Sequence, residues 1–276
     1  MSGRGPGGDA PFAPRLALAS LSGQSDAEWA RAAGEFAGAA FLGGIALDGP
    51  TREAARRMVG RDREEFLPDE PLAFVDEQLA ALADAPLRPA FNVRASEPGP
   101  IRAAAAVCAD HRAILEVNAH CRQDEMCAAG AGESLLCEPD RLARYVAVAA
   151  ETGATVSVKV RTELAGVDPP AVAARLDDAG ADIVHVDAMD SEGVVAEVVD
   201  ATDAFVVANN GVRDRETVRE YLDHGADAVS VGRPSDDPRV LRRVRAAVDE
   251  RFGGRSDPGG GFRGRATPAD TGGRNS

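Results

Sequence analysis

The chain contains almost no lysine. Lysine occurs once, at Lys159, among 31 basic residues, and 45 Asp and Glu residues bring the net charge to −14. An acidic surface of this kind repels nucleic acid and anionic membranes. In concentrated salt, charges are screened within a few ångströms, so the mutual repulsion of many acidic side chains on one protein is tolerated. We therefore interpret the charge as a mark of a high-salt cytoplasm rather than of a particular partner.

Long apolar runs are also missing. None approaches the ~18 residues that a membrane-spanning helix needs. The first residues, MSGRGPGGDAPFAP, lack the apolar core of a signal peptide. We therefore expect a cytoplasmic protein.

Cysteine is scarce, with four residues at Cys108, Cys121, Cys127 and Cys137. In a cytosolic protein these thiols are expected to stay reduced. Their spacing fits no compact zinc or iron–sulfur pattern, so we predict no metal site. Cys121 lies beside His120 and Arg122, which are surroundings typical of a reactive thiol.

Both ends of the chain are rich in Gly, Pro and Arg. This composition predicts disordered extensions over residues 1–14 and 253–276, with one domain over residues 15–252. Within that domain, short apolar runs alternate with amphipathic segments of helical period, several of which begin at Asp and end at Gly. The candidate strands are Arg15–Ser20, Ala39–Leu47, Arg88–Arg94, Ala113–Asn118, Thr155–Val160, Asp182–Asp187, Ala204–Asn209 and Asp227–Gly232.

Eight strands with alternating helices, in about 240 residues, predict a (β/α)8 TIM barrel. An open doubly wound sheet is the alternative, but no GxGxxG follows the first strand. In a barrel the site forms at the carboxyl ends of the strands, and here most strands end in polar residues. Each alone could be a turn former or a helix cap, but together they indicate a site. These strand ends hold Asn92, Arg94, Asn118, His120, Cys121, Lys159, Arg161, His185, Asp187, Asn209, Asn210, Gly211, Gly232 and Arg233.

Two features predict anion binding at this end of the barrel. The segments around Gly211 and Gly232 follow strands seven and eight, where barrels commonly bind phosphate on backbone amides, and Arg233 could add a charge. A buried ammonium at Lys159 needs an anionic partner. That partner could be reduced flavin, a substrate phosphate or a Schiff-base carbonyl, or a structural ion pair with Asp187 or Glu116.

Several motifs resemble those of the tRNA-dihydrouridine synthases and their relatives, the dihydroorotate dehydrogenases. LASLSGQSDAEWAR, NAHCRQDEM followed by GAGESLL, VKVR, VHVD, ANNGV and VGR occur in the order found in these flavoproteins. The resemblance covers about Leu16 to Arg233 and is closest to an archaeal branch of related TIM-barrel proteins, which agrees with a halophilic archaeal origin.

The resemblance implies FMN at the barrel mouth and NAD(P)H as electron donor. It implies that Lys159 lies near the flavin N1–O2 edge, that His185 and Asn92 contact the flavin, and that Asn118 orients the substrate. We also predict that Arg161, at the end of the fifth strand, binds substrate. Cys121 would donate a proton to C5 of uracil while reduced flavin delivers hydride to C6. The phosphate of FMN would be held by Asn210, Gly211, Gly232 and Arg233.

The sequence departs from the family pattern at three places. Arg122 stands where proline usually follows the cysteine, and Asp187 stands where an arginine is common. We also expect no tRNA-gripping helical domain after the barrel. The first hypothesis is an FMN-dependent reductase of the dihydrouridine synthase type that acts on uridine in tRNA, although these departures weaken the case for tRNA more than the case for flavin. The alternatives are a flavoenzyme that acts on a free pyrimidine, as dihydroorotate and dihydropyrimidine dehydrogenases do, and a flavin-less barrel that binds a ligand or acts as a lyase through Lys159.

Overall fold

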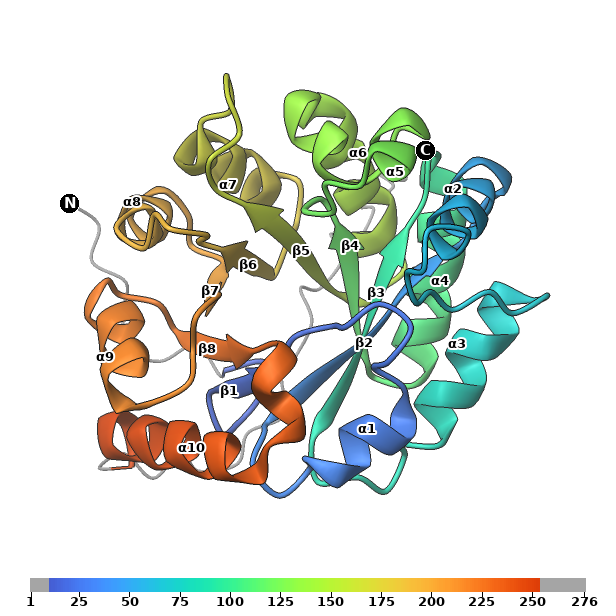
Figure 1. Cartoon of the computed structure of the whole chain (residues 1–276). Coiled ribbons are helices and arrows are strands. Elements are labelled where there is room, and N and C mark those ends of the chain that lie inside the picture. The colour runs from blue at the N-terminus through green and yellow to red at the C-terminus, as the bar shows by residue number, and fades with distance from the viewer. Residues whose placement is uncertain (1–9, 254–276) are drawn as a thin grey trace, which may run out of the picture.

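The computed structural model describes residues 10–253, which form a closed barrel of eight parallel strands (Figure 1). Each strand pairs with the next, and β8 pairs with β1, so the sheet has no free edge. The predicted (β/α)8 barrel is confirmed, and closure rules out the open doubly wound sheet. The strands are β1 Leu16–Leu18, β2 Ala39–Ala46, β3 Arg88–Arg94, β4 Ile114–Asn118, β5 Thr155–Arg161, β6 Ile183–Asp187, β7 Phe205–Asn209 and β8 Ala228–Val231.

Helices surround the barrel and follow the strands in chain order (Figure 1). Asp26, Asp48, Asp168, Asp214 and Asp237 each cap the first turn of a helix through the side chain. Among residues 10–253, no helix is both long and apolar enough to cross a membrane. The helices are α1 Ala27–Ala32, α2 Gly49–Val59, α3 Pro71–Ala80, α4 Pro98–Asp110, α5 Asp124–Ala128, η1 Gly132–Cys137, α6 Pro139–Ala150, α7 Pro169–Asp178, α8 Val194–Ala201, α9 Arg215–Asp223, η2 Arg233–Asp236 and α10 Pro238–Phe252.

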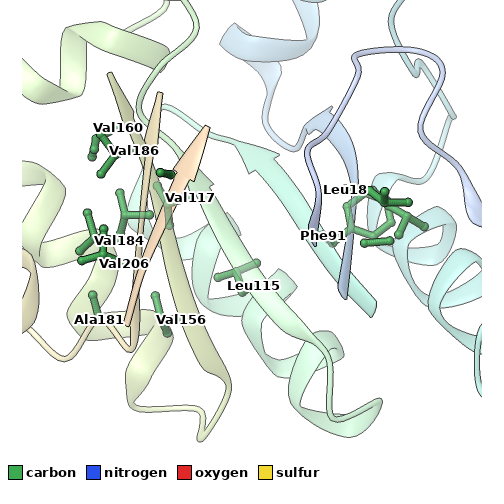
Figure 2. Close-up of a cluster of buried hydrophobic side chains, with 14 of the residues drawn as sticks. Leu18, Phe91, Leu115, Val117, Val156, Val160, Ala181, Val184, Val186 and Val206 are labelled. Atoms are coloured by element: carbon green, nitrogen blue, oxygen red, sulfur yellow. The ribbon is translucent and has the colours of Figure 1, made fainter. Parts of the chain in front are cut away.

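Alternation along each strand divides the core into two parts. On β5, Val156, Val158 and Val160 belong to the large apolar cluster that joins the strands to the helices, part of which Figure 2 shows. The side chains between them, Ser157 and Lys159, are buried but belong to no apolar cluster. Because successive side chains point to opposite faces of a strand, these polar residues face the barrel interior.

Apolar side chains fill the barrel interior at the amino-terminal ends of the strands. Phe41, Ile183 and Val207 lie there together with Phe12, whose ring packs edge-on against Phe205 at 5.5 Å. Phe12 is 4% exposed. Residues 10–14, which the composition assigns to an N-terminal extension, therefore pack against the barrel, because Phe12 closes its amino-terminal end. The other predicted extension residues, 1–9 and 254–276, lie outside the described residues.

Candidate functional site

A cavity of about 610 Å³ opens at the carboxyl ends of the strands. Its walls come from the loops after β1, β4, β6, β7 and β8, from the α2–α3 loop, and from the last residues of β3 and β5. Parallel strands bring their carboxyl ends to one edge, so residues far apart in the chain meet here. Seven of the predicted site residues line the cavity: Cys121, Lys159, Arg161, Asn210, Gly211, Gly232 and Arg233.

The other three predicted residues, Asn92, Asn118 and His185, do not line the cavity. All three are buried, and their side chains take part in a polar network inside the barrel. The resemblance implied direct contact of Asn92 and His185 with a flavin, and of Asn118 with substrate. In the structure the side-chain hydrogen bonds of these residues go to neighbouring protein groups.

Glu116 lies at the centre of this network. Its Oε1 accepts a hydrogen bond from Asn92 Nδ2 at 2.7 Å, and its Oε2 accepts one from Ser157 Oγ at 3.0 Å. His185 Nδ1 lies 2.7 Å from Oε2, and Nε2 of the same ring lies 2.8 Å from Ser230 Oγ. The network therefore joins β3, β4, β5, β6 and β8 across the barrel interior.

Burial sets the protonation of the central pair. Burial lowers the pKa of His185, although Glu116 acts in the opposite direction. For Glu116, burial alone would raise the pKa, but His185, Lys159 and the hydrogen bonds of the network outweigh it and lower the pKa. Burial thus favours the neutral imidazole of His185, whereas the surrounding hydrogen bonds and Lys159 favour the ionised carboxylate of Glu116. The sequence indicates Glu116 only as an ion-pair partner of Lys159, although its place in the apolar strand ILEVN marks it as unusual.

Asn118 connects the network to the loop that carries the thiol. Its Nδ2 donates to Asn92 Oδ1 at 2.9 Å. Its Oδ1 accepts the backbone amide of Cys121 at 3.0 Å and that of His120 at 3.3 Å. Both polar groups of Asn118 are therefore engaged, and they fix the backbone of Cys121 at the cavity wall. Cys121 is 8% exposed and its thiol is free.

The loop of residues 130–134, with the sequence GAGES, supports Cys121 from the other side. Glu133 N donates to the carbonyl oxygen of Cys121 at 2.9 Å. Gly132 has a φ of +64°, and a Cβ at this position would lie 2.3 Å from the same carbonyl oxygen, so only glycine fits. The Glu133 carboxylate pairs with Arg161 at 2.6 Å. These contacts make the loop a brace that holds the backbone of Cys121 in place.

Lys159 has an unusual environment for a charged group. It is 2% exposed, and burial lowers its pKa, which Glu116 and Asp187 partly offset. Within residues 10–253 its ammonium forms no ion pair and no hydrogen bond, so the structural ion pair that the sequence left open is not formed. Lys159 lines the cavity instead. A buried cation with this geometry can be compensated by an anionic ligand.

The opposite wall has the form of an anion cradle. Asn210 and Gly211 have φ of +98° and +66°, and Tyr221 Oη donates to the Asn210 carbonyl oxygen at 2.9 Å. In the part of the chain that the structure describes, the amides of Gly211 and Gly232 donate to no protein acceptor. Arg233 begins η2 beside them and is exposed. Unpaired amides next to a guanidinium suit a phosphate.

A buried ion pair that the sequence did not reveal supports the β2–β3 side of the site. Arg94 Nη1 lies 2.7 Å from Glu65 Oε2, and both side chains are at most 2% exposed. Gly44 lies against Arg94 and Asn92, since a Cβ there would be 3.1 Å from Arg94 Nη2 and 2.5 Å from Asn92 Oδ1. Arg94 is recognisable as a polar strand end, but Glu65 belongs to the α2–α3 loop, and no local pattern indicates that it reaches the barrel.

Metal ligands are not clustered in the described residues. Between residues 10 and 253, no group of three or more His, Cys, Asp and Glu side chains is placed to hold a metal ion. Cys127 lies near Cys121, with its Sγ 3.6 Å from the Cys121 carbonyl oxygen, whereas Cys108 is buried in α4 and Cys137 is exposed.

Solved structures share the barrel fold. Morphinone reductase in complex with tetrahydroNAD superimposes with a TM-score of 0.61 at 15% identity, covering 85% of this chain and 87% of that one. The 3-hexulose-6-phosphate synthase from Salmonella typhimurium gives a TM-score of 0.53 at 15% identity, covering 86% and 99%. At these identities the likeness shows the fold alone.

Sequence comparisons are more specific. An uncharacterized protein of Methanocaldococcus jannaschii is 26% identical over 230 residues, which span 79% of this chain and 88% of that protein. A phosphoribosyl imidazole-4-carboxamide isomerase of Desulforudis audaxviator is 36% identical over 94 residues, or 31% of this chain and 36% of that enzyme. The family model described as dihydrouridine synthase matches residues 76–260. Because this match spans more than half of the 276 residues, the chain belongs to the dihydrouridine synthase family, a family of flavin-type oxidoreductases.

Proposed function

We propose that this protein is an FMN-dependent reductase of the dihydrouridine synthase type, which saturates the C5=C6 bond of a uracil ring. The observation that carries the proposal is Lys159, a buried ammonium that has no ion-pair or hydrogen-bond partner among residues 10–253 and lines the same cavity as the Cys121 thiol. Glu116 and Asp187 offset the burial of this cation only in part, so an anionic ligand in the cavity would complete the compensation. The family provides such an anion in the form of reduced flavin.

The residues of the cavity fit FMN. A volume of about 610 Å³ lies within the range of cofactor sites. Lys159 would face the N1–O2 edge of the flavin, and the cradle formed by Asn210, Gly211, Gly232 and Arg233 would hold its phosphate. Bound FMN would supply a hydride, taken from NAD(P)H in an earlier half-reaction.

The protein's own residues would supply the proton and the alignment. Saturating a C=C bond needs a hydride on one carbon and a proton on its neighbour. We assign the proton to the Cys121 thiol, whose backbone is held by Asn118 and Glu133. Arg161 lines the cavity next to this loop and would bind a substrate oxygen. Asn92 and His185 would keep the strands that carry Asn118 and Lys159 in register.

Two substrates suit this chemistry. The resemblance to tRNA-dihydrouridine synthases implies a uridine in tRNA, whereas a free pyrimidine would need no nucleic-acid surface. The net charge of −14 favours the small substrate, because an acidic surface repels a polynucleotide. A flavin-less binding protein or lyase is the remaining alternative, in which Lys159 would meet a carbonyl or a phosphate.

A spectrum of the purified protein tests the cofactor. We expect a yellow protein whose flavin absorption bleaches with NADPH or NADH under anaerobic conditions and returns when a uracil compound is added. A colourless protein that does not take up FMN would overturn the proposal and favour the flavin-less alternative. Mass spectrometry of tRNA from a deletion strain then separates the two substrates: loss of dihydrouridine identifies tRNA, and unchanged dihydrouridine excludes it.

A further inference from the structure

The charge of the cavity is opposite to that of the chain. Seven Lys and Arg residues line the cavity against one carboxylate, Asp187, although the chain as a whole carries a charge of −14. Positive potential in a concave site raises the local concentration of anions. The site is therefore built for ligands with more than one negative group.

Some of these cations already have partners. Arg94 pairs with Glu65 and Arg161 with Glu133, while Arg213 donates to the Gly211 carbonyl oxygen at 2.9 Å. Lys159 and Arg233 are assigned to the flavin edge and the flavin phosphate. The two cations that remain are Arg63 and Arg122. Within residues 10–253 neither guanidinium makes an ion pair or a hydrogen bond, and both are exposed at the cavity.

Arg63 and Arg122 belong to loops that pack against each other. Arg61 bridges them, since its Nε lies 2.7 Å from Glu125 Oε1 and its Nη2 donates to Gln123 Oε1 at 3.3 Å. Met58 of α2 and Cys121 share a small apolar cluster beneath. The backbone that carries each arginine is therefore held close to Cys121, the proposed proton donor. The phosphate cradle of Asn210, Gly211, Gly232 and Arg233 belongs to the loops after β7 and β8.

Carboxylates occupy the outer surface of the same loops. Asp62 and Glu64 flank Arg63, and Asp124 follows Arg122 by two residues. All three carboxylates are exposed, and none lines the cavity. A polynucleotide crossing this surface would meet them, whereas one phosphate group on a small molecule could reach the arginines from inside the cavity.

We propose that Arg63 and Arg122 form a second anion site, which binds the phosphate of a pyrimidine mononucleotide substrate. The base would lie over the flavin beside Cys121, and the phosphate would reach the cavity mouth. Guanidinium groups suit this task because they bind phosphate through paired hydrogen bonds. This inference rests on the proposed function, since it names the substrate class of the same site.

Steady-state kinetics of the holoprotein test the site, with UMP and uridine as substrates. We expect the kcat/KM for UMP to exceed that for uridine at least tenfold. In the double variant Arg63→Ala/Arg122→Ala, the KM for UMP should rise about tenfold or more, which corresponds to about 1.4 kcal/mol. The kcat/KM for uridine and the flavin content should stay unchanged.

Arg144→Ala/Arg243→Ala provides the matched control, because both residues are exposed, lie on the outer helices α6 and α10, and do not line the cavity. This variant loses the same charge and should retain the preference for UMP. Equal turnover of UMP and uridine, an unchanged KM for UMP in the Arg63→Ala/Arg122→Ala variant, or turnover of tRNA alone would each overturn the proposal.

Calorimetry separates failure of this inference from failure of the proposed function. A protein without flavin would refute the reductase but leave the arginines in place, and titration with UMP would still measure them. Binding of UMP that weakens in Arg63→Ala/Arg122→Ala and not in Arg144→Ala/Arg243→Ala supports the site. Binding that is absent, or equal in all forms, refutes it.

Discussion

The side-chain oxygen of Asn118 accepts the backbone amide of Cys121 at 3.0 Å, which ties the thiol loop to the interior of the barrel. Asn118→Ala would leave buried amides without an acceptor, at a cost of about 1–3 kcal/mol in the free energy of unfolding. We expect turnover to fall at least tenfold while flavin stays bound. Ser157→Ala is the control: it removes a buried hydrogen bond to Glu116 without touching the loop, so it should lower stability but largely keep turnover.

Gly132 should tolerate no side chain. A Cβ at this position would lie 2.3 Å from the Cys121 carbonyl oxygen, so Gly132→Ala must displace the thiol loop. Gly153→Ala introduces a comparable backbone strain at φ +81° but meets nothing within 4 Å. Both variants should lose about 1 kcal/mol or more of stability in denaturant titrations, yet only Gly132→Ala should reduce turnover. Equal turnover in the two would show that the brace is unnecessary.

Lys159 should be required for flavin binding. The ammonium is buried and forms no ion pair or hydrogen bond among the described residues, although Glu116 and Asp187 partly offset the cost of its burial. Lys159→Met removes this cation from the cavity wall. The same change should weaken FMN binding at least tenfold in fluorescence titrations. Lys159→Arg keeps the charge but places a wider guanidinium in the same space, and we expect weaker binding or slower flavin reduction. Normal flavin affinity in both variants would mean that Lys159 does not contact the cofactor.

Cys121 should affect chemistry and leave cofactor binding intact. Loss of a positioned general acid typically costs about 10²–10⁴ in rate. Cys121→Ala should therefore retain flavin and its reduction by NAD(P)H, while reoxidation by the uracil substrate slows by that factor in stopped-flow measurements. Cys127→Ala serves as control, because its thiol lies in the same loop region but does not line the cavity. Unchanged reoxidation in Cys121→Ala would refute the role of the thiol.

Stability should decrease toward acidic pH because of His185. Burial lowers the pKa of His185 below its ordinary value of 6.5, so the unfolded chain takes up a proton before the folded one does. The free energy of unfolding therefore falls as pH drops below 6.5. The lowered pKa of Glu116 adds a further loss below its ordinary value of 4.5. Urea titrations between pH 7.5 and 4.5, at constant salt, measure the slope.

His120 contributes to the same slope, since burial and nearby cations lower its pKa well below 6.5. His185→Gln and His120→Gln should each remove part of the pH dependence, and the double variant should remove more than either. A slope that is the same in wild type and in the double variant would show that neither histidine is held neutral by the fold.

Much of the architecture could be predicted from local patterns. Alternating apolar runs and capped helices indicated the barrel, because burial on both faces of a parallel strand imposes a sequence pattern that no tertiary contact needs to reveal. Phe12 shows the limit of this reasoning. Its neighbours are Gly, Pro and Ala, so composition indicated an extension, whereas its ring closes the end of the barrel. One isolated aromatic residue produces no periodic pattern in the sequence, so its burial could not be predicted.

The location of the candidate site could be predicted from the sequence, but the roles of its individual residues could not. The positions of the strand ends identified the residues, because the carboxyl ends of all eight strands meet at one face of the barrel regardless of loop conformation. They did not distinguish Lys159, which lines the cavity, from His185, which bonds to Glu116 and Ser230 beneath it. Both are polar residues on neighbouring strands, in register with each other. The difference depends on which side chains surround each one, and these come from several strands.

The amino-acid sequence by itself determined the barrel, its carboxyl-end site and the presence of one lysine there, because strand period and strand order are local properties of the chain. Only the tertiary structure decided that Lys159 forms no ion pair or hydrogen bond within residues 10–253, that Asn118 accepts the backbone amide of Cys121, and that Arg63 and Arg122 line the same cavity. These facts depend on distances between residues far apart in the chain, and hydrogen bonds and charge pairs form only where folding brings their groups within reach.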